Sequence, residues 1–116
     1  MKRKQLRFSK LVKIMKKLLS PDGCPWDRKQ THKSLLKYLD EEVKEFKRSV
    51  AKNDYSNMKE ELGDILLQVV FHSELASKNG YFDIYDVIDT LCEKLIRRHP
   101  HVFANLKVKN EKEVLK

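Results

Sequence analysis

Hydrophobic and polar positions alternate with a helical period along most of the chain. Apolar residues recur at gaps of three and four over residues 8–19, 36–50 and 84–95, which places them on one face of an α-helix. Only three glycines and three prolines interrupt the chain, so few turns are available and the elements must be long. The pattern therefore predicts an all-α fold, a helical bundle of four to five helices.

Turn and capping residues set the expected bounds of the first two helices. The first is expected over about residues 9–19, because residues 20–23 read Ser-Pro-Asp-Gly, which is typical of a turn. The second is expected over about residues 31–52, with Thr31 as its N-cap. Its apolar residues form a seam of the kind found in helical bundles. This seam consists of Leu36, Leu39, Val43, Phe46 and Val50.

The next two helices have equally clear ends. The third is expected over about residues 55–78, closed by Asn79 and Gly80 as a C-cap. The fourth begins near Asp83, which can act as an N-cap, and ends before Pro100.

One polar stripe runs along the otherwise apolar third helix. Residues 62–76 are apolar on most sides of the helix, which is typical of a helix buried among others. The stripe lies within about 60° of one direction on the helical wheel. It consists of Glu61, Asp64, Gln68 and His72. Because burying an unpaired carboxylate is costly and residues 60–77 contain no Lys or Arg, a metal ion is the simplest partner for these acids.

The second helix carries a further group of acids beside its seam. Glu41, Glu42 and Glu45 flank the seam, and on this helix alone a solvated face is the simpler interpretation, helped by pairing of Glu45 with Arg48. The third helix changes that balance. Glu42 with Glu45, and Glu61 with Asp64, are two pairs that are each three residues apart. On neighbouring helices such pairs can hold one or two Mg²⁺ ions.

Two residues of the third helix have ordinary alternative explanations. His72 is interpreted as a satisfied core histidine, because oxygen-rich sites for hard cations seldom need imidazole. Gly63 costs about 1 kcal/mol relative to Ala inside a helix. Close approach of another backbone or of a ligand would be a reason to keep it.

Composition fits a single domain over residues 1–116, since 41% of the residues are hydrophobic. Within it, residues 1–22 are expected to form a basic amphipathic helix and its turn. Residues 104–116 are expected to be a tail that ends inside a short helical start at Glu111, as a truncated segment would.

The net charge of +8 is concentrated at the start of the chain. Residues 1–17 hold eight Lys and Arg and no acid, which leaves 17 basic and 17 acidic residues elsewhere. The simplest interpretation is a helix that packs its apolar side and solvates its lysines. Contact with a membrane surface or with RNA through this segment is the alternative. Because the rest of the chain is neutral, nucleic acid is not an expected partner.

The cysteines and the apolar runs indicate the compartment. Cys24 and Cys92 belong to no CxxC motif, so a reduced, cytoplasmic protein is expected rather than a disulfide scaffold. The longest apolar runs, residues 65–67 and 69–71, are too short to span a bilayer, so no membrane partner is expected.

Cationic and aromatic residues elsewhere suit a phosphate ligand. Lys94, Arg97 and Arg98 share one face at the end of the fourth helix, where the helix dipole alone also favours cations. As an alternative, they would donate to phosphate oxygens. No glycine-rich phosphate loop is present, so phosphates would be held through metal and side chains. Trp26 is the single tryptophan. A buried core residue is its preferred interpretation, and an aromatic platform for a ligand is the alternative.

Several motifs occur in order over about residues 24–103. They are Cys24-Pro25-Trp26-Asp27, Gln30-Thr31-His32, Glu41-Glu42-x-x-Glu45, Glu61-Leu62-Gly63-Asp64, and the run from Lys94 to Phe103 that contains Arg-Arg-His-Pro-His-Val-Phe. In these motifs the chain resembles the MazG-type nucleoside triphosphate pyrophosphohydrolases of the all-α NTP pyrophosphatase superfamily. The resemblance implies Mg²⁺-dependent hydrolysis of a nucleoside triphosphate between its α and β phosphates, with Mn²⁺ as a possible substitute.

The resemblance also assigns roles to residues. It implies that the metal ligands are Glu42, Glu45, Glu61 and Asp64. Glu41 would then orient water, Lys94, Arg97 and Arg98 would bind the triphosphate, and Trp26 would lie near the base.

The resemblance also bears on oligomeric state and on the number of domain copies. The family implies a homodimer or higher homo-oligomer in which helices of two chains complete a four-helix core. Many relatives carry two copies of this domain, whereas this chain has one. The alternative function is a non-catalytic dimerisation or regulatory module that binds nucleotide.

Overall fold

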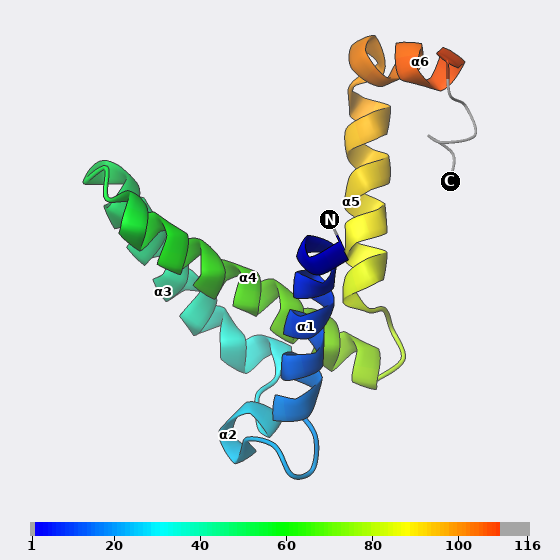
Figure 1. Cartoon of the computed structure of the whole chain (residues 1–116). Helices are drawn as coiled ribbons and strands as arrows, with labels where there is room; N and C mark the ends of the chain where they lie inside the picture. Colours follow the sequence, from blue (N-terminus) through cyan, green and yellow to red (C-terminus); the bar gives the residue numbers. More distant parts are fainter. Residues whose placement is uncertain (1, 110–116) are drawn as a thin grey trace. The chain divides into compact units, whose positions relative to one another are not determined.

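The computed structural model describes the backbone of residues 2–109, together with the side chains of residues 4 and 6–104. The described residues are all-helical, with six helices, four of them long, and no strand, which confirms the all-α prediction. The helices are α1 (Lys2–Leu18), α2 (Pro25–Arg28), α3 (His32–Ala51), α4 (Tyr55–Lys78), α5 (Ile84–Arg98) and α6 (Pro100–Lys109) (Figure 1). The chain divides into two compact units, of which one ends at Phe82 and the other begins at Asp83.

Helices α3 and α4 form a hairpin whose ends are set by local capping. Thr31 and Ser34 exchange hydrogen bonds at the start of α3, since each side chain accepts from the other residue's backbone N–H, at 3.0 and 2.8 Å. The Asp54 side chain caps α4 by accepting from the N–H of Asn57 at 3.1 Å. Three residues, 52–54, join the helices, which therefore run antiparallel and side by side (Figure 1). The predicted bounds of both helices are confirmed within one residue.

Helix α1 packs its apolar side against the C-terminal half of α4. Lys16 Nζ lies 2.8 Å from the carboxylate of Glu74, and Lys78 Nζ donates to the carbonyl of Leu19 at 3.2 Å. The buried hydrophobic residues of this unit are Val12, Met15, Leu19, Leu35, Val70, Phe71 and Ala76. The structure agrees with an amphipathic helix, since Val12 and Met15 are buried while the described lysines of α1 are exposed. The helix begins earlier than expected, because residues 2–7 are mostly good helix formers without a breaker.

The chain between α1 and α3 contains a short helix that the sequence did not predict. Helix α2 begins at Pro25, a residue that suits the first helical position because its missing N–H needs no partner there. Gly23 precedes it, and a Cβ at this position would lie 2.2 Å from the carbonyl oxygen of Lys17. Trp26 on α2 is 50% exposed, so its interpretation as a core residue is wrong.

Large apolar residues on α3 and on α4 up to Val69 stay exposed in the single chain. They are Leu36, Val50, Leu62, Leu66, Leu67 and Val69, each 38–52% exposed. Burial of the third predicted helix on most sides is therefore found only from Val70 onward.

The second unit contains α5 and α6. Asp83 caps α5 as predicted, in a capping box with Asp86. The sequence predicted no helix at α6, because Pro100 was taken as an end, whereas here it is the first residue of a new helix. The described part of the expected tail, up to Lys109, is thus helical, and the expected helical start at Glu111 lies outside the described residues. No described helix is long and apolar enough to cross a bilayer.

Candidate metal centre

Three carboxylates meet across the α3–α4 hairpin. Glu42 comes from α3, while Glu61 and Asp64 are one turn apart on α4. One oxygen atom from each of the three lies within 4.8 Å of the others. We call these three residues the acidic cluster. The antiparallel hairpin brings them together, because residues near the middle of α3 face residues near the start of α4.

The acidic cluster has no positive partner among the described residues. The ion pairs among the described residues are Lys16–Glu74, Lys17–Asp22 and Arg48–Glu45, and none of them includes a residue of the acidic cluster. One carboxylate oxygen of Glu61, Oε2, is buried without a hydrogen-bond partner.

Burial and the negative charges of its neighbours raise the pKa of Glu42. Desolvation is the largest cause, followed by the charges of Asp64 and Glu61, and together they bring this pKa to about 7. Carboxylate oxygens that repel one another across a hairpin are a suitable ligand set for a hard divalent cation, which would relieve both effects.

Glu45 and Glu41 lie outside the acidic cluster. Glu45 pairs with Arg48 on the same helix, as the solvated-face interpretation anticipated. Glu41 is exposed. The structure thus brings together three of the four expected metal ligands, and the roles of Glu45 as a ligand and of Glu41 stay predictions.

The other two residues of the polar stripe are only partly satisfied. Nδ1 of His72 lies 2.7 Å from Nδ1 of His32, and the two rings are stacked with centroids 5.0 Å apart. Nε2 of His72 and Oε1 of Gln68 are buried without a partner. Burial, and secondly the charge of His32, lower the pKa of His72. His72 therefore fits the description of a satisfied core histidine at only one of its two nitrogens.

Gly63, between the two acids of α4, faces open space in the single chain. A Cβ placed there would meet nothing within 4 Å. The close approach that would justify a glycine is thus not made by any described part of this chain.

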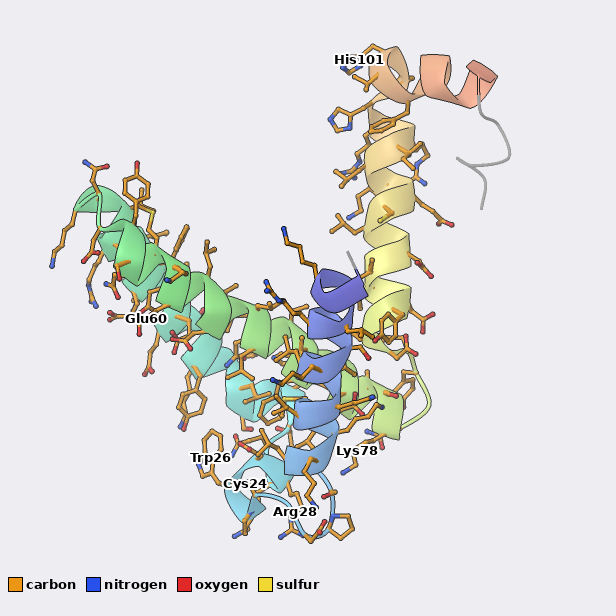
Figure 2. All side chains as sticks on the ribbon, viewed as in Figure 1. Cys24, Trp26, Arg28, Glu60, Lys78 and His101 are labelled. Carbon is orange, nitrogen blue, oxygen red and sulfur yellow. The ribbon has the colours of Figure 1, made fainter. Side chains whose placement is uncertain are left out.

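An aromatic pair lies near the same hairpin. The edge of one ring faces the other in the pair Trp26–Tyr38, with centroids 5.6 Å apart. Tyr38 lies four residues before Glu42, so both side chains project from the same side of α3. The sequence interpretation missed Tyr38, although its spacing from Glu42 was a usable signal. Figure 2 shows Trp26 at α2, and Glu60 and Lys78 near opposite ends of α4.

The expected phosphate-binding cations belong to the second unit. Lys94 on α5 is half-buried, while Arg97 and Arg98 are exposed. Their spacing of three and four residues places them on one face of α5, as predicted. Their role toward a phosphate stays a prediction.

Comparisons with known proteins give a consistent result. A nucleoside triphosphate pyrophosphohydrolase/pyrophosphatase MazG of Thermotoga maritima is 58% identical over 105 residues, which cover 90% of this chain and 41% of that protein. A nucleoside triphosphate pyrophosphohydrolase of Escherichia coli K12 is 42% identical over 110 residues, covering 94% of this chain and 42% of that protein. The uncharacterised protein YabN of Bacillus subtilis is 49% identical over 108 residues, covering 93% of this chain and 22% of that protein.

The chain spans less than half the length of each of these three relatives. Residues 30–103 match the model of a protein family described as the MazG nucleotide pyrophosphohydrolase domain. This match includes all three residues of the acidic cluster and the cations of α5. The chain belongs to the MazG nucleotide pyrophosphohydrolase domain family.

Proposed function

We propose that this chain hydrolyses nucleoside triphosphates at the α–β phosphate bond in a Mg²⁺-dependent reaction, which releases a nucleoside monophosphate and pyrophosphate. One observation carries the proposal. Glu42, Glu61 and Asp64 lie within 4.8 Å of one another, and no described cationic side chain pairs with any of them. Family membership supports the choice of a nucleotide as substrate.

The acidic cluster would hold Mg²⁺, or Mn²⁺ in its place, because both prefer carboxylate oxygens. Glu45 is the proposed fourth ligand, since it lies one turn from Glu42 on α3. A bound Mg²⁺ supplies positive charge to the phosphate oxygens and activates water for the hydrolysis. Glu41, also on α3, would accept a hydrogen bond from that water and orient it toward the α phosphorus.

The remaining roles concern the substrate. Lys94, Arg97 and Arg98 would donate to the oxygens of the triphosphate, for which the planar guanidinium fork of Arg is well suited. Trp26, half-exposed and already in contact with Tyr38, offers an aromatic surface to the base.

A second copy of the chain is the proposed cover for the exposed apolar residues of α3 and α4. Exposed apolar side chains that gather on one helical hairpin are typical of an interaction surface. A homodimer with a four-helix core would cover them, and would also bring another backbone toward the open space at Gly63.

A panel of nucleoside and deoxynucleoside triphosphates with Mg²⁺ tests the activity. Glu42→Ala and Asp64→Ala should each abolish release of pyrophosphate while helix content is retained. Glu60→Ala is the matched control, because Glu60 is an exposed acid next to Glu61 that lies outside the acidic cluster. Absence of both products from every substrate with the wild-type chain would refute the proposal.

The second candidate function is a non-catalytic dimerisation or regulatory module that binds nucleotide. It is favoured by the length of the relatives, which contain much more than this domain. Binding of a triphosphate without turnover, measured by calorimetry beside the product assay, would select it.

A further inference from the structure

Two polar atoms on α4 remain without a partner beyond the acidic cluster. Oε1 of Gln68 and Nε2 of His72 are buried and reach no hydrogen-bonding atom among the described residues. Gln68 is only 7% exposed, so its amide is almost fully removed from water. Folded proteins pair nearly all such groups, and an orphan indicates a ligand or a partner that completes it.

These atoms continue the line of the acids. Gln68 and His72 lie four and eight residues beyond Asp64 on the same side of α4, which is about 6 and 12 Å along the helix axis. The hairpin is tied on both sides of Gln68, because Glu42 meets the acids of α4 at one end and His32 meets His72 at the other. The Gln68 amide therefore lies along the α3–α4 interface, next to the proposed phosphate site.

Aromatic surface lies at the same level of α3. Tyr38 stands between His32 and Glu42 in the chain, and the ring of Trp26 meets its edge. These three features suit three parts of a nucleotide. The acidic cluster suits the phosphates, the buried amide suits the hydrogen-bonding edge of the base, and the aromatic pair suits the face of the base.

We propose that Gln68 is the residue that recognises the base of the nucleotide, with Oε1 accepting a hydrogen bond from a base N–H. This inference rests on the proposed function, since it assigns the base to one end of the site and the phosphates to the acidic cluster. The side-chain NH₂ of Gln68 can donate to a neighbouring acceptor on the same base edge. The aromatic pair covers the face of the base, and His72 Nε2 lies one further turn along, where it closes the polar end of the subsite.

Replacement of Gln68 by Met tests the assignment, because Met has a similar length and no amide. Ser73→Ala is the matched control, since Ser73 is also buried on α4 but its hydroxyl is satisfied by the carbonyl of Val69 at 2.7 Å. For Gln68→Met, KM for nucleoside triphosphates should rise at least about tenfold, with a smaller change in kcat. Affinity for inorganic tripolyphosphate with Mg²⁺, which has no base, should be unchanged.

Three outcomes would overturn the assignment. The first is an unchanged KM, and the second is an equal loss of affinity for nucleotide and for tripolyphosphate. The third is a loss of self-association in sedimentation with nucleotide affinity intact, which would indicate that Gln68 contacts a second copy of the chain. If Gln68→Met fails to fold, Gln68→Glu serves instead. That variant keeps an acceptor and loses the N–H donor, so it should change the order of preference among the bases, and an unchanged order would contradict the assignment.

The proposed function can fail separately. If the wild-type chain releases no pyrophosphate, binding of a non-hydrolysable triphosphate is compared with binding of tripolyphosphate in the wild type and in Gln68→Met. A nucleotide preference that disappears only in Gln68→Met supports the base subsite without turnover. The same preference in both proteins refutes it.

Discussion

Each half of α4 contains an acid with a buried carboxylate oxygen, and the two acids differ in their partners. Glu74, in the C-terminal half, is 6% exposed and pairs with Lys16 of α1 at 2.8 Å. Glu61, in the N-terminal half, has a buried carboxylate oxygen without any partner and lies against two further acids. Glu74 is paired with a cation of the same chain, so it contributes to the packing of α1 against α4. Glu61 has no such partner among the described residues, which is the reason to expect a cation from solution.

The largest expected effect is on turnover, and it tests the N-terminal half of α4, where the acids have no cationic partner. Asp64→Asn should lower turnover about a thousandfold, because several kcal/mol of charge stabilisation are lost with the metal. The thermal midpoint of the metal-free variant should not fall, since one of three repelling charges is removed. Turnover and melting of both proteins with and without Mg²⁺ check this. A thousandfold loss of turnover that coincides with unfolding would contradict the proposed difference between the two halves of α4.

The next effect concerns packing. Phe71→Ala in the C-terminal half should lower the free energy of unfolding by about 3–5 kcal/mol, because Phe71 is buried against its neighbours. Leu62→Ala in the N-terminal half is the matched substitution, and it should cost much less in a dilute single chain, since Leu62 is 51% exposed. Denaturant unfolding at several protein concentrations separates the two. A cost for Leu62→Ala that grows with concentration would indicate a covering second copy.

A smaller effect is expected for the paired acid. Glu74→Gln should lower the free energy of unfolding by about 1 kcal/mol, because the ion pair with Lys16 is lost while a hydrogen-bonding group remains. Lys16 is about half-exposed, so its charge can be solvated instead. Turnover per folded molecule should be unchanged. A large drop in turnover with normal stability would assign Glu74 to the site and contradict the comparison.

The smallest effect is a dependence of stability on pH. Burial lowers the pKa of His72 below its ordinary value of 6.5, so the folded chain favours the neutral ring. The resulting contribution to stability is complete above about pH 6.5 and is lost as pH falls through the lowered pKa. Glu42, whose pKa is raised to about 7, titrates in the same range with the opposite effect on stability, in the wild type and in His72→Phe alike. The decline should therefore appear as the difference between the melting curves of these two proteins between pH 4.5 and 8. An equal decline in both proteins would assign it to other groups.

Local signals in the sequence predicted the long helices well. The ends of α3, α4 and α5 follow from Thr31, Asn79 and Asp83, each of which acts through atoms a few residues away. The acidic cluster was predicted in outline, because carboxylates three residues apart on neighbouring helices need only an antiparallel hairpin to meet.

The failures share a different cause. The contact of His32 with His72 joins residues 40 apart in the chain, and no local pattern indicates it. Glu45 has two possible partners, a metal and Arg48. The ion pair with Arg48 is formed, and the role of Glu45 as a metal ligand stays a prediction. Helices α2 and α6 were missed because a proline that can end a helix can equally begin one. Exposure of Trp26 depends on which elements cover α2, and that is a property of the whole unit.

The short connection between α3 and α4 has a consequence for how the site forms. Glu42 and Asp64 are separated along the chain only by the ends of two helices and by residues 52–54, where Asn53 adopts a positive φ of 53°. Closing so short a loop costs little entropy, and contacts between near neighbours in sequence form early in folding. We therefore expect the three carboxylates to come together when this hairpin forms, before the contact of Lys16 with Glu74, which joins residues 58 apart in the chain. If a cation binds the acidic cluster at that stage, we expect it to favour formation of the hairpin, so the proposed metal site would also influence folding.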